Sequence, residues 1–258
     1  MRSARALLVA ATLAALGACA DGDKTPMTTS PEQPAPAWIA RVAEARRTEP
    51  SRAPALLVLL HGIGADENDL FPLARHLDPR FTVVSLRAPH DYHGGYAWFP
   101  IDFRPDGSVI PDLAAARATV EDLVRWIAAA PAAHKTDPRR TFLLGFSQGA
   151  MMSLGALRAA PERLAGVVAL SGRAVDGVST PGPTDATITV PVFVAHGTHD
   201  DVLPIAEGRR IRDTLGPRCA DFTYREYPVG HGIADDELAT VAAWLTTHLD
   251  AVSAATAR

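Results

Sequence analysis

Short apolar runs alternate with longer helical patterns from residue 55 onward, and this alternation constrains the fold more than any other feature. The runs that predict buried strands are Ala55–Leu60, Phe81–Leu86, Thr141–Leu144, Gly166–Leu170 and Pro191–Ala195, while Phe222–Tyr227 predicts a strand nearer an edge. The patterns that predict helices are Asp66–His76, Asp112–Ala130, Gln148–Ala160, Ile205–Leu215 and Asp235–Leu249. Such alternation is typical of βαβ units, so we expect an α/β fold with a mostly parallel central sheet and helices on both faces.

Length and composition indicate one globular core. The chain has 258 residues, of which 47% are hydrophobic, and this is enough to fold without disulfide bonds. Its formal net charge is −4 and it has no basic run, so we expect no nucleic-acid partner. Ahead of the first strand, Trp38–Pro50 fits either a short helix or an outer strand.

The N-terminal segment has the pattern of an export signal. Arg2 and Arg5 precede an apolar stretch over residues 6–18, which is shorter than the roughly 20 residues that span a bilayer. Cys19 follows Leu16-Gly17-Ala18, and this sequence resembles the bacterial lipobox, in which the cysteine is lipidated and becomes the first mature residue. The alternative is an ordinary cleavage site with a bystander cysteine.

We therefore expect a signal peptide over residues 1–18, a polar and proline-containing tether over residues 19–36, and one folded domain over residues 37–258. Lipidation of Cys19 would anchor an exported protein to a membrane on the periplasmic side of a bacterial cell envelope. Cys219 would then have no disulfide partner, and we expect it to be a packing residue.

The segment Gly145-Phe146-Ser147-Gln148-Gly149 follows a predicted strand and opens a predicted helix of small residues. A serine on a sharp strand-to-helix turn needs small neighbours two residues to either side, because strand and helix approach closely there. Gly145 and Gly149 meet this need, and the helix N-terminus favours negative charge near the serine. The pattern predicts that Ser147 is a nucleophile.

A serine hydroxyl is a weak nucleophile at neutral pH and needs a histidine base that a carboxylate orients. In a fold with such a serine turn, the acid and then the histidine follow the serine along the chain. His231 lies in a glycine-flanked loop after the last predicted strand and is the predicted base, while Asp200 and Asp201 remain alternatives for the acid. His196 and His199 precede them, but this spacing lacks a distant third ligand, so we expect no metal site. A serine, a histidine and an acid complete the expected reaction, so we also expect no organic cofactor.

The loop His61-Gly62-Ile63-Gly64 directly follows the first predicted central strand. A tetrahedral intermediate needs two backbone N–H donors about 3 Å from its oxygen, one after the nucleophile and one from the loop after this strand. The glycines allow the backbone to approach a substrate closely. We therefore predict that the N–H groups of Ile63 and Gln148 form an oxyanion hole.

Five segments occur together in this chain: His61-Gly62-Ile63-Gly64, Gly94-Gly95-Tyr96-Ala97-Trp98-Phe99, Gly145-Phe146-Ser147-Gln148-Gly149, His196-Gly197-Thr198-His199-Asp200 and Gly230-His231. Their combination resembles the phospholipase/carboxylesterase family of α/β hydrolases, which includes acyl-protein thioesterases and small bacterial esterases. The resemblance covers roughly residues 55–249 and implies an α/β-hydrolase fold with Asp200 as the acid. It also implies that Trp98 and Phe99 shape the substrate pocket.

Other segments near the predicted catalytic residues bear on the pocket. Leu203 and Ile233 flank these residues in the sequence, so we expect them to add apolar wall. Tyr92–Phe103 is a long aromatic connection of the kind that covers active sites. Arg173–Thr189 is rich in Pro, Gly, Asp and Thr, which predicts a surface excursion.

These expectations converge on a serine carboxylesterase that acts on small-molecule acyl esters of short to medium chain length. A lysophospholipase or an acyl thioesterase acting on longer chains is the alternative enzyme, suggested by the expected membrane anchor. A different class is a lipoprotein that keeps the fold as a catalytically idle binding module, against which the intact set of catalytic residues argues.

Overall fold

A computed structural model of the chain describes residues 34–46, 52–103, 109–179 and 187–255. The predicted signal peptide, the predicted lipidation site Cys19 and the predicted tether up to residue 33 lie outside the described residues. No helix within the described ranges has the length and apolar character needed to cross a bilayer.

The predicted parallel sheet is present and has seven strands in the order β1-β3-β2-β8-β9-β10-β11. Their bounds are Ala40–Ala43 (β1), Ala55–Leu60 (β2), Phe81–Leu86 (β3), Thr141–Phe146 (β8), Gly166–Leu170 (β9), Val192–Gly197 (β10) and Phe222–Tyr227 (β11). All neighbouring pairs are parallel except β1 and β3, which are antiparallel. The ambiguous segment Trp38–Pro50 thus contributes an outer strand, and the six predicted strands are confirmed with small shifts at their ends.

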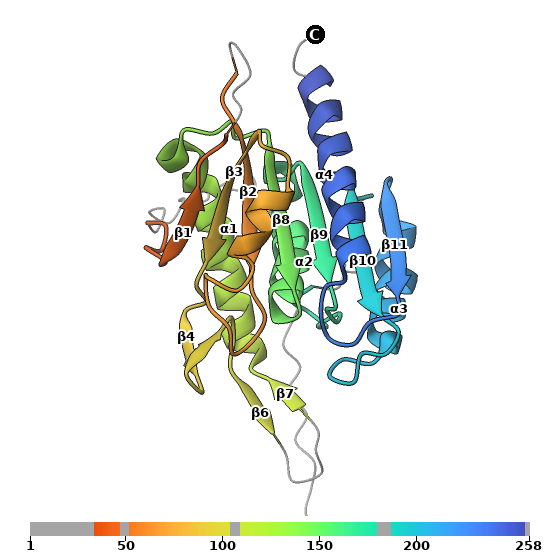
Figure 1. The fold of residues 1–258 in the computed structure, drawn as a ribbon. Helices are drawn as coiled ribbons and strands as arrows, with labels where there is room; N and C mark the ends of the chain where they lie inside the picture. The colour runs from red at the N-terminus through yellow and green to blue at the C-terminus, as the bar shows by residue number, and fades with distance from the viewer. Residues whose placement is uncertain (1–33, 47–51, 104–108, 180–186, 256–258) are drawn as a thin grey trace, which may run out of the picture. The chain divides into compact units, whose positions relative to one another are not determined.

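Helices cover both faces of the sheet, as predicted (Figure 1). On one face lie α1 (Leu113–His134), α2 (Gln148–Ala159) and α3 (Ile205–Leu215), and on the other lie the 3₁₀ helix η1 (Phe71–His76) and α4 (Asp235–Ala255). Strand β2 is fully buried because alternate side chains enter the two separate cores on its two sides.

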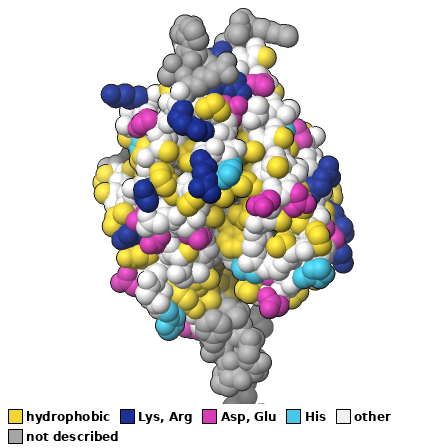
Figure 2. Space-filling view, viewed as in Figure 1, with side chains coloured by type: hydrophobic (Ala, Val, Ile, Leu, Met, Phe, Trp, Pro, Cys, Tyr) yellow, Lys and Arg dark blue, Asp and Glu magenta, His cyan; other side chains and the backbone are white. Residues whose placement is uncertain are grey.

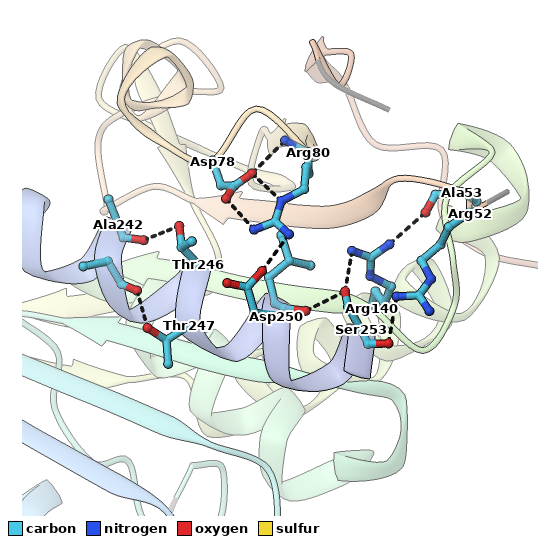
Figure 3. Close-up of polar contacts among 12 residues, drawn as sticks. Arg52, Ala53, Asp78, Arg80, Arg140, Ala242, Thr246, Thr247, Asp250 and Ser253 are labelled. Carbon is cyan, nitrogen blue, oxygen red and sulfur yellow. Dashed lines mark hydrogen bonds and ion pairs between the residues drawn. The ribbon is translucent and has the colours of Figure 1, made fainter. Parts of the chain in front are cut away.

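Arginine side chains tie the far half of α4 to the sheet (Figure 3). Arg80 contacts both Asp78 and Asp250 at 2.7 Å, and the buried Arg140 donates to Ser253 Oγ at 2.9 Å and to the Ala53 carbonyl at 3.1 Å. These contacts fix the C-terminal half of α4. The first turn of α4 directly follows the loop that carries His231.

The predicted helix Asp66–His76 is wrong over its first half. The Asp66 carboxylate accepts a hydrogen bond from the Asn68 N–H at 2.8 Å, and the Asp66 carbonyl accepts one from Asp69. Side-chain bonds of this kind favour turns over helix, so only the 3₁₀ helix η1 forms, with Pro72 in its first turn.

Two small hairpins interrupt the connection between β3 and α1, and the sequence patterns did not predict them. One pairs β4 (His90–Tyr92) with β5 (Gly95–Ala97), and the other pairs β6 (Ile101–Phe103) with β7 (Val109–Pro111). Both lie beyond the carboxyl ends of the parallel strands, the end to which the arrowheads point in Figure 1. This is the end of a parallel sheet at which active sites form.

Charges of both signs are interspersed on the face shown in Figure 2, where Lys and Arg side chains stand between acidic ones. The described residues of that face therefore offer no continuous basic surface of the kind that binds a phosphate backbone.

Candidate active site

Ser147 lies at the turn between β8 and α2 with backbone angles φ 53° and ψ −114°, a conformation that non-glycine residues rarely adopt. The flanking glycines make this turn possible. A Cβ at Gly145 would lie 2.2 Å from the Gly149 carbonyl oxygen, and a Cβ at Gly149 would lie 2.0 Å from that of Leu60. Strand and helix therefore meet with no space for side chains, and the serine is held at the strand end.

The structure brings Ser147, His231 and Asp200 together. The Ser147 hydroxyl lies 2.9 Å from His231 Nε2, and His231 Nδ1 lies 2.7 Å from Asp200 Oδ2. The Asp200 side chain is fully buried, whereas the adjacent Asp201 is exposed. Burial and distance thus distinguish the two carboxylates that the residues alone left as alternatives.

Backbone donors hold the Asp200 carboxylate in place. Its Oδ1 accepts hydrogen bonds from the N–H groups of Val202 at 3.0 Å and Leu203 at 2.8 Å, which leaves Oδ2 for His231. The buried His196 donates from Nε2 to the Leu203 carbonyl at 2.8 Å and so braces the same loop. Within the described ranges, no group of three or more His, Cys, Asp or Glu residues could hold a metal ion.

The loops that carry the acid and the histidine are joined by their backbones. The N–H groups of Thr198 and His199 donate to the carbonyls of Tyr227 at 2.7 Å and Val229 at 3.1 Å. A Cβ at Gly197 would lie 2.3 Å from the Val229 carbonyl oxygen, so only glycine allows this approach. The two loops are thereby fixed relative to each other.

The predicted oxyanion loop lies directly against the serine, since a Cβ at Gly62 would be 3.3 Å from Ser147 Cβ. His61 is fully buried beneath it, donates from Nδ1 to the Gly62 carbonyl at 2.7 Å and accepts the Ala88 N–H on Nε2 at 3.1 Å. Burial lowers the pKa of His61, so the ring is neutral and its tautomer is set by these two bonds. The loop is therefore supported by an uncharged side chain.

The β4–β5 hairpin holds the other side of the oxyanion loop. Gly64 has φ +83° and donates to the Tyr96 carbonyl at 2.8 Å, and the Tyr96 N–H donates back to Ala65 at 2.9 Å. The hairpin approaches closely because a Cβ at Gly95 would overlap the Gly64 carbonyl, at 1.9 Å. Ile63 thus lies between Gly62 and Gly64, and the backbone of each of these glycines is held by a hydrogen bond.

Gln148 has two separate uses. Its backbone N–H opens α2 and has no carbonyl one turn earlier to bond, so it is a candidate oxyanion donor. Its buried side chain accepts a hydrogen bond from the backbone N–H of Trp98 at 2.7 Å and donates one to the Phe99 carbonyl at 2.8 Å. The residue after the serine therefore also fastens the aromatic connection over the site.

A cavity of about 390 Å³ opens beside the serine. It is lined by Ile63, Tyr92, Phe99, Ile101, Pro111, Ser147, Gln148, Met151, Arg173, Val175, Val202, Leu203, Pro204 and Glu207. Among the predicted pocket residues, Phe99 and Leu203 line it, whereas Trp98 and Ile233 do not. Trp98 is fully buried, donates from Nε1 to the His61 carbonyl at 2.8 Å and packs edge-on against Trp38, while Ile233 packs against the core under α4.

Comparison with known proteins agrees with this geometry. A sequence model of the phospholipase/carboxylesterase family matches residues 41–249. The chain belongs to this family. Among solved structures of similar fold, a carboxylesterase from Bacillus cereus has a TM-score of 0.70 at 25% identity, with 82% of this chain and 95% of that chain covered. Esterase PE8 has a TM-score of 0.67 at 32% identity, with 81% and 98% covered. The protein thus has the α/β-hydrolase fold.

Curated family relatives match over different lengths. Acyl-protein thioesterase 1 from Gibberella zeae is 34% identical over 119 residues, which cover 43% of this chain and 49% of the relative. The chain therefore spans about half the length of this relative. A probable carboxylesterase from Oryza sativa is 25% identical over 213 residues, which cover 78% and 80%.

In this member of the phospholipase/carboxylesterase family, the segment Arg173–Thr189 after β9 was predicted to be a surface excursion, but its first part is buried. Ala174, Val175 and Val178 are buried, and Arg173 and Val175 line the cavity. The sequence signal for this was present, because Ala174, Val175 and Val178 stand close together in a stretch rich in Pro, Gly, Asp and Thr. Residues 180–186 of the same segment lie outside the described ranges.

A buried acid lies in the first turn of α4, three residues after the His231 loop, and sequence reasoning missed it. Glu237 is 1% exposed; its Oε2 accepts the Ala234 N–H at 3.3 Å, and its Oε1 has no partner among the described residues. Burial raises the pKa of Glu237 to about 7. The carboxyl is therefore protonated in the folded protein at mildly acidic pH.

This raised pKa predicts a pH-dependent stability. Between the ordinary value of 4.5 and about 7, the unfolded chain ionises Glu237 while the fold keeps it neutral, so the free energy of unfolding falls as pH rises. Glu237→Gln removes this titration. Relative to wild type, we expect the free energy of unfolding to change little at pH 4 and to rise by about 3 kcal/mol at pH 8. Urea unfolding at both pH values measures this. Glu121→Gln, at an exposed position, is the control. An equal change in the free energy of unfolding of Glu237→Gln at pH 4 and pH 8 would contradict the prediction.

Proposed function

We propose that the protein is a serine carboxylesterase that hydrolyses short- to medium-chain acyl esters. The observation that carries this proposal is the continuous hydrogen-bonded chain from the Ser147 hydroxyl through the His231 imidazole to the buried Asp200 carboxylate. This arrangement activates a serine for attack on a carbonyl carbon, and the family to which the chain belongs supports the assignment.

In the proposed mechanism, Ser147 Oγ attacks the ester carbonyl while His231 Nε2 takes the hydroxyl proton. Asp200 accepts the Nδ1–H bond and stabilises the imidazolium that forms. The N–H groups of Ile63 and Gln148 donate to the oxyanion of the tetrahedral intermediate. His231 then returns the proton to the leaving alcohol, and a water molecule repeats the sequence to release the acid.

The size of the cavity supports short to medium acyl chains. Its volume of about 390 Å³ lies near the lower end of the usual range for ligand cavities, roughly 300–1,000 Å³. A thioesterase acting on longer acyl chains is the second candidate, favoured by the similarity to a protein named acyl-protein thioesterase 1.

A chain-length series separates the candidates. We expect kcat/KM for p-nitrophenyl esters to peak between butyryl and octanoyl and to fall for palmitoyl. A higher kcat/KM for palmitoyl thioesters than for any of these esters would favour the second candidate. No turnover of any ester, together with no labelling of Ser147 by a fluorophosphonate, would indicate the binding module instead.

A further inference from the structure

The cavity beside Ser147 contains two charged side chains that ester hydrolysis does not use. Most of its lining residues are apolar, and the charged residues among them are Arg173 and Glu207. Arg173 Nε and Glu207 Oε2 are both buried and have no hydrogen-bond partner among the described residues. A buried polar atom without a partner is rare in native proteins and needs an explanation. Both residues line the same cavity.

The backbone before Arg173 is fixed close to the serine. Ser171, directly after β9, has a positive φ of 48° and donates to the Ala195 carbonyl at 2.9 Å. A Cβ at Gly172 would lie 2.7 Å from Ala150 Cβ and 3.5 Å from the Ser147 carbonyl oxygen. Strained backbone of this kind clusters at ligand sites. Arg173 therefore lines the cavity from a rigid stretch of backbone beside the nucleophile.

The chemistry of a guanidinium defines the group it would bind. Arginine stays charged at any physiological pH and presents a planar set of donors that matches the two oxygens of a carboxylate or a phosphate. In a cavity with mainly apolar walls, such a bond is stronger than in water. A singly charged carboxylate suits this cavity better than a doubly charged phosphate, because Glu207 adds a negative charge to the same wall.

We propose that the preferred substrate is an ester that carries a free carboxylate, and that Arg173 in the cavity wall binds this carboxylate while Ser147 attacks the ester carbonyl. This inference rests on the proposed esterase function. It makes Arg173 a specificity-determining residue and predicts that acidic esters, such as monoesters of dicarboxylic acids, are better substrates than neutral esters of equal length.

A matched pair of substrates tests the proposal. Both p-nitrophenyl hexanoate and the mono-p-nitrophenyl ester of adipic acid have six-carbon acyl chains, and only the second carries a carboxylate. We expect Arg173→Gln to lower the ratio of their kcat/KM values, acidic over neutral, by about 10- to 100-fold, and Arg173→Lys to restore part of it. Glu207→Gln is the control of opposite charge and should raise the same ratio, since it removes a repulsion.

A carboxylate on the alcohol side of the ester is tested in a second arm, with 4-carboxyphenyl butyrate against phenyl butyrate. If the carboxylate binds Arg173 from this side, the ratio of kcat/KM values, acidic over neutral, should fall in Arg173→Gln for this pair. Equal losses for both members of each pair would show that Arg173 only supports the fold. That result would overturn the proposal, as would Arg173→Gln activity equal to wild type on every substrate of both pairs.

Binding without turnover separates this proposal from the proposed function. Adipate should bind the wild-type protein in titration calorimetry, the uncharged hexanamide should bind more weakly, and adipate binding should be lost in Arg173→Gln. Adipate binding through Arg173 with no hydrolysis of any ester would refute the esterase function alone. Hydrolysis of the neutral esters, with no adipate binding and no change in the ratios, would refute the role of Arg173 alone.

Discussion

Ser147→Ala is expected to lower kcat for p-nitrophenyl butyrate by about 10⁶-fold, because removal of the nucleophile from a serine triad also removes the use of its base. The Ser147 Oγ is the atom that lies 2.9 Å from His231 Nε2, and alanine has no hydroxyl to replace it. Labelling by a fluorophosphonate should disappear with the activity. Both are read from the purified protein, with circular dichroism to show that the variant is folded.

Ser153→Ala is the matched control for this variant. Ser153 lies in the same helix, is fully buried and has a hydroxyl without a hydrogen-bond partner among the described residues, so alanine should be tolerated. We expect activity within about 2-fold of wild type. Near-normal activity of Ser147→Ala, or loss of labelling in Ser153→Ala alone, would refute Ser147 as the nucleophile.

The second large effect concerns the acid. Asp200→Asn should lower kcat by about 10⁴-fold, because an amide facing His231 Nδ1 favours the tautomer that cannot accept the serine proton. Asn keeps an oxygen for the N–H groups of Val202 and Leu203, so the loop should stay in place. Steady-state kinetics of the folded variant measures the loss.

Asp201→Asn is the adjacent control, since Asp201 is exposed and the carboxylate bonded to His231 is that of Asp200. We expect a change of less than about 2-fold. If Asp201→Asn lost activity and Asp200→Asn retained it, the assignment of the acid would be reversed.

The sequence predicted the central strands of the sheet well because they are buried on both faces. Every residue of Ala55–Leu60 is buried, and such a continuous apolar run between helical patterns is typical of a central strand in a parallel sheet. Ser147 was predictable for a related reason, since the glycines around it leave no room for a side chain and few other turns need both.

Features that depend on tertiary contacts could not be predicted in the same way. Asp200 and Asp201 are chemically identical neighbours, and only the burial of one beside His231 distinguishes them. The β4–β5 hairpin has three-residue strands whose support comes from the Ala65–Tyr96 pairing, which local patterns do not encode. The family resemblance implied that Trp98 shapes the pocket, yet its indole N–H donates to the His61 carbonyl beneath the oxyanion loop.

Strand β9 differs from its neighbours in the loop at its carboxyl end. The ends of β8, β10 and β11 lead to Ser147, Asp200 and His231, and the end of β2 leads to the oxyanion loop, whereas the end of β9 leads to Arg173 and contributes no member of the triad. Divergence of related enzymes toward new substrates can therefore proceed by exchange of this one loop while the reaction is preserved. The same loop is the natural place to begin when the substrate range of this protein is redesigned.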